Sequence, residues 1–279
     1  MATIKVNGVE LFYKESGSGP ETIVFSHGLL MDHSMFDAQR AAFQGQYRVI
    51  AYDHRGQGQS QASTQCDMDT LTDDAAAFIQ ALNAGPCHFA GLSMGGFVGI
   101  RLAARHPELV RSLTLMCTGA ESEPLHNRIR YGLLGQIVKI VSPAPFVAIA
   151  IRELFGATTR KDPSKQALVE AWKAKIRSWP RTLAYSILSV MNRRDAAADL
   201  GVIRCPTLVI TGEDDTAQPP QNGERMAAGI RLSTFIKIPA CGHSCSLEAP
   251  EAVVEAMKKI LCSNPEVLPQ VRSAAASQR

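Results

Sequence analysis

The sequence predicts an α/β fold in which a mostly parallel, eight-stranded sheet is flanked by helices and interrupted by an inserted helical cap. Short β-rich runs alternate with helical periodicity toward both ends of the chain, which is typical of a parallel sheet covered on both faces. Between residues 121 and 195 this alternation stops, and only helical patterns remain. The 279 residues, 46% of them hydrophobic, suffice for one large domain with such an insertion.

The first predicted element is an antiparallel hairpin over residues 4–13, which turns at Asn7-Gly8 and forms an edge of the sheet. The remaining strands and the helices between them follow in alternation. We predict strands at residues 22–26, 47–52, 87–90, 113–117, 207–211 and 234–238, and helices at residues 69–82, 96–105, 221–228 and 251–261.

The pattern of the inserted segment predicts four helices separated by prolines. We predict them at residues 126–140, 144–154, 163–176 and 181–191, with Pro143, Pro145, Pro163 and Pro180 between or beside them. The expected organisation is therefore a core formed by residues 1–120 and 196–262 and a cap formed by residues 121–195. Residues 263–279 have little apolar content and are expected to form a poorly ordered tail.

Charge is distributed unevenly along the chain. The formal net charge is only +3, which gives no reason to expect a nucleic-acid partner. Residues 122–194 nevertheless hold 13 Lys or Arg against 4 Asp or Glu. This excess either attracts an anionic substrate or forms the solvated faces of the cap helices, and the sequence leaves both readings open.

The N-terminus lacks the pattern of a cleaved signal peptide, and no segment reaches the roughly 18 apolar residues of a membrane helix. We therefore expect no membrane partner and a cytoplasmic protein. The seven cysteines are irregularly spaced, which favours free thiols in a reducing compartment. Cys241 and Cys245 flank a histidine, but no second ligand pair has a matching spacing, so we expect no metal and no cofactor.

The strongest chemical signal is Gly91-Leu92-Ser93-Met94-Gly95, a G-x-S-x-G pattern between a predicted strand and a predicted helix. A serine on this sharp turn takes a positive φ, so its hydroxyl projects freely. The flanking positions approach so closely that a side chain would clash, which explains Gly91 and Gly95. The following helix N-terminus supplies partial positive charge. These features predict Ser93 as a nucleophile.

In this context the chain resembles the α/β-hydrolase superfamily from about residue 4 to residue 262. Four further segments resemble the family's patterns in the expected order. They are Ser26-His27-Gly28-Leu29-Leu30, the segment 52–60 with the sequence YDHRGQGQS, Thr211-Gly212-Glu213-Asp214-Asp215, and Ala240-Cys241-Gly242-His243-Ser244 followed by Leu247-Glu248-Ala249-Pro250.

The resemblance implies a Ser-Asp-His triad in that chain order. His243, after Gly242 and past the last strand, is the expected general base. Asp215 is the expected acid because it lies three residues after Gly212, and Pro219 follows four residues later. Asp214 and, after the sixth strand, Glu121 are the alternative acids.

The resemblance also assigns supporting roles. The backbone N–H groups of Leu29 and Met94 are expected to form the oxyanion hole. His27 is expected to support its loop, whereas Asp53 and Arg55 are expected to form a structural turn.

Within the family, a serine nucleophile excludes the members that use aspartate there and leaves esterases, lactonases, C–C bond hydrolases, perhydrolases and some lyases. We expect a carboxylic ester hydrolase that acts through an acyl-serine intermediate. The Gly-Leu-Ser-Met-Gly-Gly run and the compact cap resemble the branch of 3-oxoadipate enol-lactonases, arylesterases and acyl-homoserine lactonases. The expected partner is therefore a small ester or lactone, and the sequence does not indicate an oligomeric state. Two alternatives remain open, namely a cofactor-free perhydrolase or haloperoxidase and a ligand receptor on the same fold.

Overall fold

The computed structural model describes residues 2–261 of the chain, so the predicted tail and Cys262 lie outside the described residues. One eight-stranded sheet runs through the molecule in the order β1-β2-β4-β3-β5-β6-β7-β8. The strands are β1 (Ala2–Val6), β2 (Val9–Ser16), β3 (Thr22–Ser26), β4 (Arg48–Tyr52), β5 (Cys87–Leu92), β6 (Val110–Met116), β7 (Thr207–Gly212) and β8 (Ser233–Ile238).

The pairing confirms the predicted sheet. Strands β1 and β2 pair as an antiparallel hairpin across Asn7-Gly8, and β2 pairs antiparallel with β4. All the other neighbours are parallel. Strands β3 and β5 to β7 are buried along their whole length except for Arg111, as expected for central strands covered on both faces.

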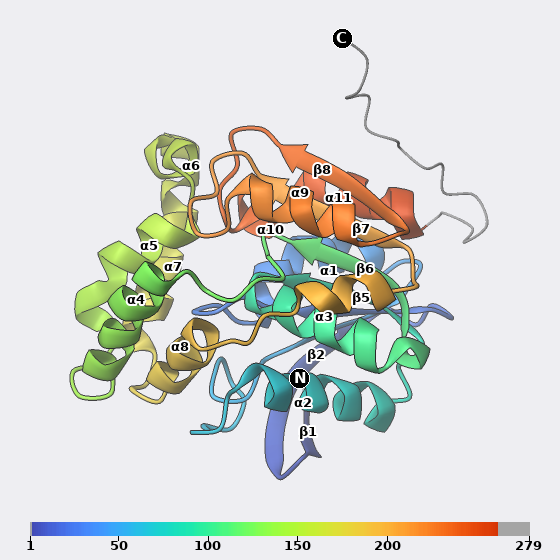
Figure 1. The fold of residues 1–279 in the computed structure, drawn as a ribbon, viewed down its shortest axis with the longest axis horizontal. Helices are drawn as coiled ribbons and strands as arrows, with labels where there is room; N and C mark the ends of the chain where they lie inside the picture. The colour runs from blue at the N-terminus through green and yellow to red at the C-terminus, as the bar shows by residue number, and fades with distance from the viewer. Residues whose placement is uncertain (1, 262–279) are drawn as a thin grey trace.

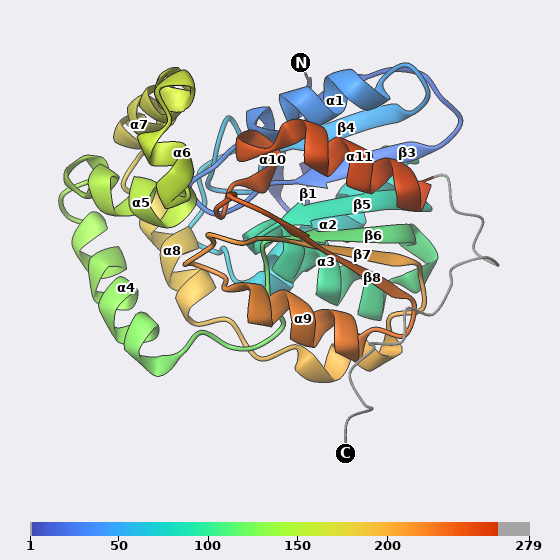
Figure 2. The same ribbon diagram turned by 90° about the horizontal axis from the view of Figure 1, so that it is seen from above.

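Helices cover both faces of the sheet. Figure 2 shows α1 (Asp37–Phe43) and α11 (Pro250–Leu261) on one face, and α2 (Met68–Ala81), α3 (Met94–Arg105) and α9 (Pro220–Gly229) on the other. A short helix α10 (Cys245–Glu248) precedes α11. Helices α1 and α10 were not predicted, whereas α2, α3, α9 and α11 begin and end within two residues of their predicted bounds.

The cap helices follow β6 and precede β7. They are α4 (Leu125–Val138), α5 (Val147–Leu154), α6 (Ala157–Lys161), α7 (Gln166–Ser178) and α8 (Leu183–Met191). They form a separate layer beside the sheet, on the left of Figures 1 and 2. The structure adds α6, which was not predicted, to the four expected helices.

We propose residues 121–195 as the cap and the flanking segments as the core. Two hydrogen bonds close the base of the insertion, which supports these boundaries. The Ala196 N–H donates to the carbonyl of Ala120 at 2.8 Å, and the Ser122 N–H donates to Asp195 Oδ2 at 3.2 Å. The inserted chain therefore leaves and re-enters the core at one place.

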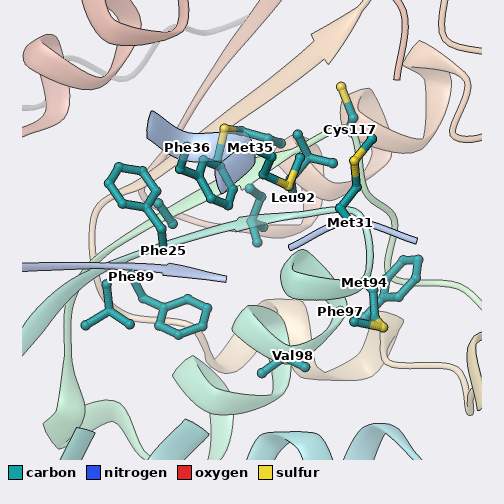
Figure 3. Close-up of a cluster of buried hydrophobic side chains, with 14 of the residues drawn as sticks. Phe25, Met31, Met35, Phe36, Phe89, Leu92, Met94, Phe97, Val98 and Cys117 are labelled. Carbon is teal, nitrogen blue, oxygen red and sulfur yellow. The ribbon is translucent and has the colours of Figure 1, made fainter. Parts of the chain in front are cut away.

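The apolar core lies around the central strands, as Figure 3 shows. Phe25 and Phe36 stack with their ring centroids 4.7 Å apart on one face of the sheet, and Phe89 lies on the other face, against α3. Leu92 and Phe97, on either side of the strand-to-helix turn after β5, are each 1% exposed. This packing fixes the turn that carries Ser93.

Candidate active site

Ser93 occupies the sharp turn between β5 and α3, and its backbone has φ +50° and ψ −111°. The predicted positive φ is therefore confirmed. A Cβ at Gly91 would lie 2.2 Å from the carbonyl oxygen of Gly95, and a Cβ at Gly95 would lie 2.0 Å from that of Ser26. The predicted steric role of both glycines is also confirmed, because no side chain fits at such distances.

Hydrogen bonds hold the strained residue in place. The Ser93 N–H donates to the carbonyl of Met116 at 2.9 Å. Its carbonyl accepts from Thr118 Oγ1 at 2.8 Å and from the Phe97 N–H at 3.0 Å. The main-chain groups of Ser93 are thereby engaged, while its side chain lies at the wall of a cavity.

His243 and Asp215 form a buried pair. His243 Nδ1 lies 2.9 Å from Oδ2 and 3.1 Å from Oδ1 of Asp215. The carboxylate also accepts the N–H groups of Ala217 at 2.9 Å and Gln218 at 2.8 Å, both at Oδ1. A proton donated from Nδ1 makes Nε2 the basic ring nitrogen. His243 lines the same cavity as Ser93.

The two alternative acids point elsewhere. Asp214 Oδ2 accepts a hydrogen bond from Thr158 Oγ1 at 2.7 Å. Glu121 forms an ion pair with Arg225. The structure therefore brings Asp215, and neither alternative, into contact with His243.

The surroundings of His243 change its basicity. Burial favours the neutral ring and lowers its pKa, but the charge of Asp215 and its hydrogen bond raise the pKa. Glu248 and Glu153 add to this effect, and the net result is a pKa above the ordinary histidine value of 6.5.

Glu248 organises the loop that carries His243, a role that the sequence did not reveal. Its buried carboxylate accepts the N–H groups of Gly242 at 3.1 Å, Ser244 at 3.0 Å and Gly156 at 2.9 Å. The first two flank His243, and Gly156 belongs to the cap. One carboxylate thus joins the histidine loop to the cap. The sequence pattern contained Glu248, but only the fold shows its partners.

The two residues expected to form the oxyanion hole belong to different segments, since Leu29 follows β3 and Met94 follows Ser93. Leu29 lines the cavity, and Met94 is the first residue of α3. Within residues 2–261, no hydrogen bond engages either backbone N–H. Gln57 links the two segments, because its Oε1 accepts the Leu30 N–H at 3.0 Å and its Nε2 lies 3.5 Å from Met94 Sδ.

The supporting residues behave as the resemblance implied. His27 Nδ1 donates to the Gly28 carbonyl at 2.8 Å, and its Nε2 accepts the His54 N–H at 3.0 Å. Asp53 accepts the His33 N–H at 2.7 Å and the Gln59 N–H at 2.8 Å, while Arg55 pairs with Asp74. These groups hold loops in place.

A cavity of about 670 Å³ lies between the core and the cap. Its cap side includes apolar residues, among them Leu134, Phe146 and Ile187. Phe155, Trp172 and Trp179 do not line this cavity and are buried.

The cavity also contains charged side chains. Glu123 pairs with Arg193, whose guanidinium lies 4.2 Å above the Phe97 ring. Glu153 accepts the Tyr131 hydroxyl at 2.9 Å. Burial and this carboxylate raise the pKa of Tyr131 to about 12, so the phenol stays protonated.

The cysteines within residues 2–261 form no disulfides. All six cysteines within the described part of the chain are free, and Cys117, Cys241 and Cys245 are buried close to the histidine loop. Burial raises the pKa of the Cys241 thiol, so it is not a ready nucleophile. No group of three or more potential metal ligands occurs in residues 2–261.

A parallel sheet with a strained serine after its central strand, and a His-Asp pair at the ends of neighbouring strands, defines the hydrolase class of α/β folds. The family model described as alpha/beta hydrolase fold matches residues 21–250. The chain therefore belongs to the alpha/beta hydrolase family.

The chain is also similar to individual proteins, at sequence identities of 25–30%. The chain is 29% identical to 3-oxoadipate enol-lactonase 1 of Acinetobacter baylyi over 241 residues, which cover 85% of this chain and 88% of the relative. A thermophilic esterase from Thermogutta terrifontis, solved with malate bound, superposes with a TM-score of 0.85 at 30% identity, covering 93% and 96% of the two chains. The enol-lactonase of Burkholderia xenovorans gives 0.87 at 25% identity, covering 94% and 100%.

Proposed function

We propose that this protein is a serine hydrolase that cleaves carboxylic esters or lactones through an acyl-Ser93 intermediate. The observation that carries the proposal is the convergence of a strained serine and a buried His243–Asp215 pair on one cavity. The relatives named above support the same chemistry, since an esterase and two enol-lactonases are among them.

Each residue has a defined task in this mechanism. His243 Nε2 takes the proton of Ser93 Oγ as the oxygen attacks the carbonyl carbon. Asp215 stabilises the imidazolium that results. The N–H groups of Leu29 and Met94 then donate to the oxyanion, and each is worth roughly 3 kcal/mol in the transition state.

The attack produces a tetrahedral intermediate. Its collapse breaks the bond between the carbonyl carbon and the alcohol oxygen, and His243 returns the proton to that leaving oxygen. His243 next deprotonates a water molecule, which attacks the acyl-serine carbonyl. The carboxylic acid is released, and Ser93 Oγ regains its proton. In a lactone the alcohol and the acid remain on one product.

A hydrolysis screen tests the proposal. It compares p-nitrophenyl esters of short and long acids, aryl esters, an acyl-homoserine lactone and a carboxylated enol-lactone. We expect a burst of p-nitrophenol followed by steady turnover, both abolished by Ser93→Ala. Peracid-dependent halogenation faster than any hydrolysis would favour the perhydrolase alternative, and tight ligand binding with negligible turnover would favour the receptor.

We also propose that the protein acts in the cytoplasm, because free thiols suit a reducing compartment. Within the described residues, none of the helices has the length and apolar character needed to cross a bilayer.

A further inference from the structure

The cap helix α4 has two apolar faces. One face packs on α8, where the buried Gly135 allows a close approach, since a Cβ there would lie 3.0 Å from Leu188. The other face carries Leu125, Ile129, Leu133 and Ile137 and continues to Ile140 just beyond the helix. We call these five residues the α4 stripe.

The α4 stripe faces away from the protein. Its side chains are between 37% and 73% exposed. They recur every three or four residues and therefore form one continuous surface. Figures 1 and 2 both show α4 at the outer edge of the cap, with α8 between α4 and the sheet. An apolar face of this extent marks an interaction site on a protein.

The charges around the α4 stripe indicate the chemistry of its partner. Helix α4 itself carries Arg128 and Arg130 and no Asp or Glu, and Lys139, just after it, lies over the Tyr185 ring. By helical periodicity, the exposed Arg128 borders the stripe on one side. On the other side lies Arg130, which is exposed but also lines the cavity, with its guanidinium 5.0 Å from the centre of the Tyr131 ring. An apolar stripe between basic edges is typical of a helix that lies in the interface of an anionic membrane.

A second copy of the chain fits this surface less well. Two copies that met through α4 would bring the same arginines together, because a two-fold interface repeats the same patch on both sides. Residues 124–152 offer no carboxylate to neutralise these charges, so like-charge contacts would oppose the association.

We propose that the α4 stripe docks on an anionic lipid surface, with Arg128 contacting lipid phosphates. The sequence analysis predicted no membrane partner, because no segment is apolar enough to span a bilayer. The proposal departs from that prediction in favour of peripheral binding. The opposite side of α4 lines the cavity through Tyr131 and Leu134. Docking would therefore bring the cavity close to the lipid surface.

Cosedimentation of the full chain with vesicles tests the proposal. One set of vesicles contains phosphatidylglycerol and phosphatidylcholine, and the other contains phosphatidylcholine alone. We expect binding at low salt to the first set and much weaker binding to the second. The double variant Ile129→Gln/Leu133→Gln should bind the anionic vesicles about tenfold more weakly or worse. Arg128→Gln should lower the affinity about fivefold.

Val202→Gln is the matched control, because Val202 is an exposed aliphatic residue (52%) outside the cap. It should bind like the wild type, and all variants should keep the wild-type melting temperature because they change exposed side chains. Failure of the wild type to bind anionic vesicles would overturn the proposal. Unchanged binding by both Ile129→Gln/Leu133→Gln and Arg128→Gln would overturn it as well. A wild-type dimer that the double variant converts to a monomer, without vesicle binding, would identify a second copy as the partner instead.

Discussion

The substitution Asp215→Asn tests the assignment of the acid most sharply. Oδ1 of Asp215 accepts two backbone N–H groups, from Ala217 and Gln218. An asparagine must keep its oxygen at that position, so its NH₂ group replaces Oδ2, which lies 2.9 Å from His243 Nδ1. Two donors would then face each other.

The imidazole relieves this conflict by changing tautomer, so that Nδ1 accepts and Nε2 carries the proton. In that form His243 does not take the proton of Ser93. We expect the rate of ester hydrolysis to fall about 10⁴-fold, equivalent to about 5 kcal/mol in the barrier, while the fold persists. Initial rates with p-nitrophenyl butyrate, together with the melting temperature, measure both effects.

Asp214→Asn is the control for this experiment. Its carboxylate contacts Thr158 and not His243, so we expect less than about a threefold change in rate. Asp215→Asn with a rate within tenfold of wild type, or a large loss in Asp214→Asn instead, would refute the reasoning.

Three further predictions concern proton transfer, positioning and packing. Since the base must be neutral and the pKa of His243 is raised, kcat/KM should increase with pH through a midpoint above 6.5; a pH–rate profile that is flat from pH 5 to 9 would contradict this. Gln57→Ala should lower kcat by about tenfold to a hundredfold with little change in KM, because the loop carrying Leu29 loses the hydrogen bond from the Leu30 N–H to Gln57 Oε1. An unchanged kcat in steady-state kinetics would exclude this positioning role. Gly95→Ala should reduce the free energy of unfolding by about 3 kcal/mol, whereas Gly132→Ala, where a Cβ meets nothing within 4 Å, should raise it slightly; urea denaturation measures both, and equal effects would count against the close contact at residue 95.

Most of the core was predictable because its signals are local. Strand β3 has the predicted bounds, and the Asn7-Gly8 turn forces the hairpin that precedes it. The turn around Ser93 was predictable for the same reason, since its glycines and its strained backbone belong to five consecutive residues.

The features that escaped prediction depend on contacts between distant segments. The helix α6 contains two threonines and no apolar stripe, so the sequence gives no helical pattern there. Its N-cap residue, Gly156, packs closely on Gly242, because a Cβ added to Gly242 would lie 2.1 Å from the Gly156 nitrogen. Glu248 gains its role only when the cap and the histidine loop meet. The periodicity of α4 predicted a helix, but two apolar faces did not reveal which one packs on α8.

The proposed mechanism requires a covalent bond between the acyl group of the substrate and Ser93 Oγ. Rapid quenching of the protein with p-nitrophenyl acetate, followed by mass spectrometry of its peptides, measures that bond directly. We predict a mass increase of one acetyl group on Ser93, formed during the burst and absent from the Ser93→Ala variant. Turnover without this adduct under conditions in which deacylation is slow, or an adduct on another residue, would contradict the proposed chemistry.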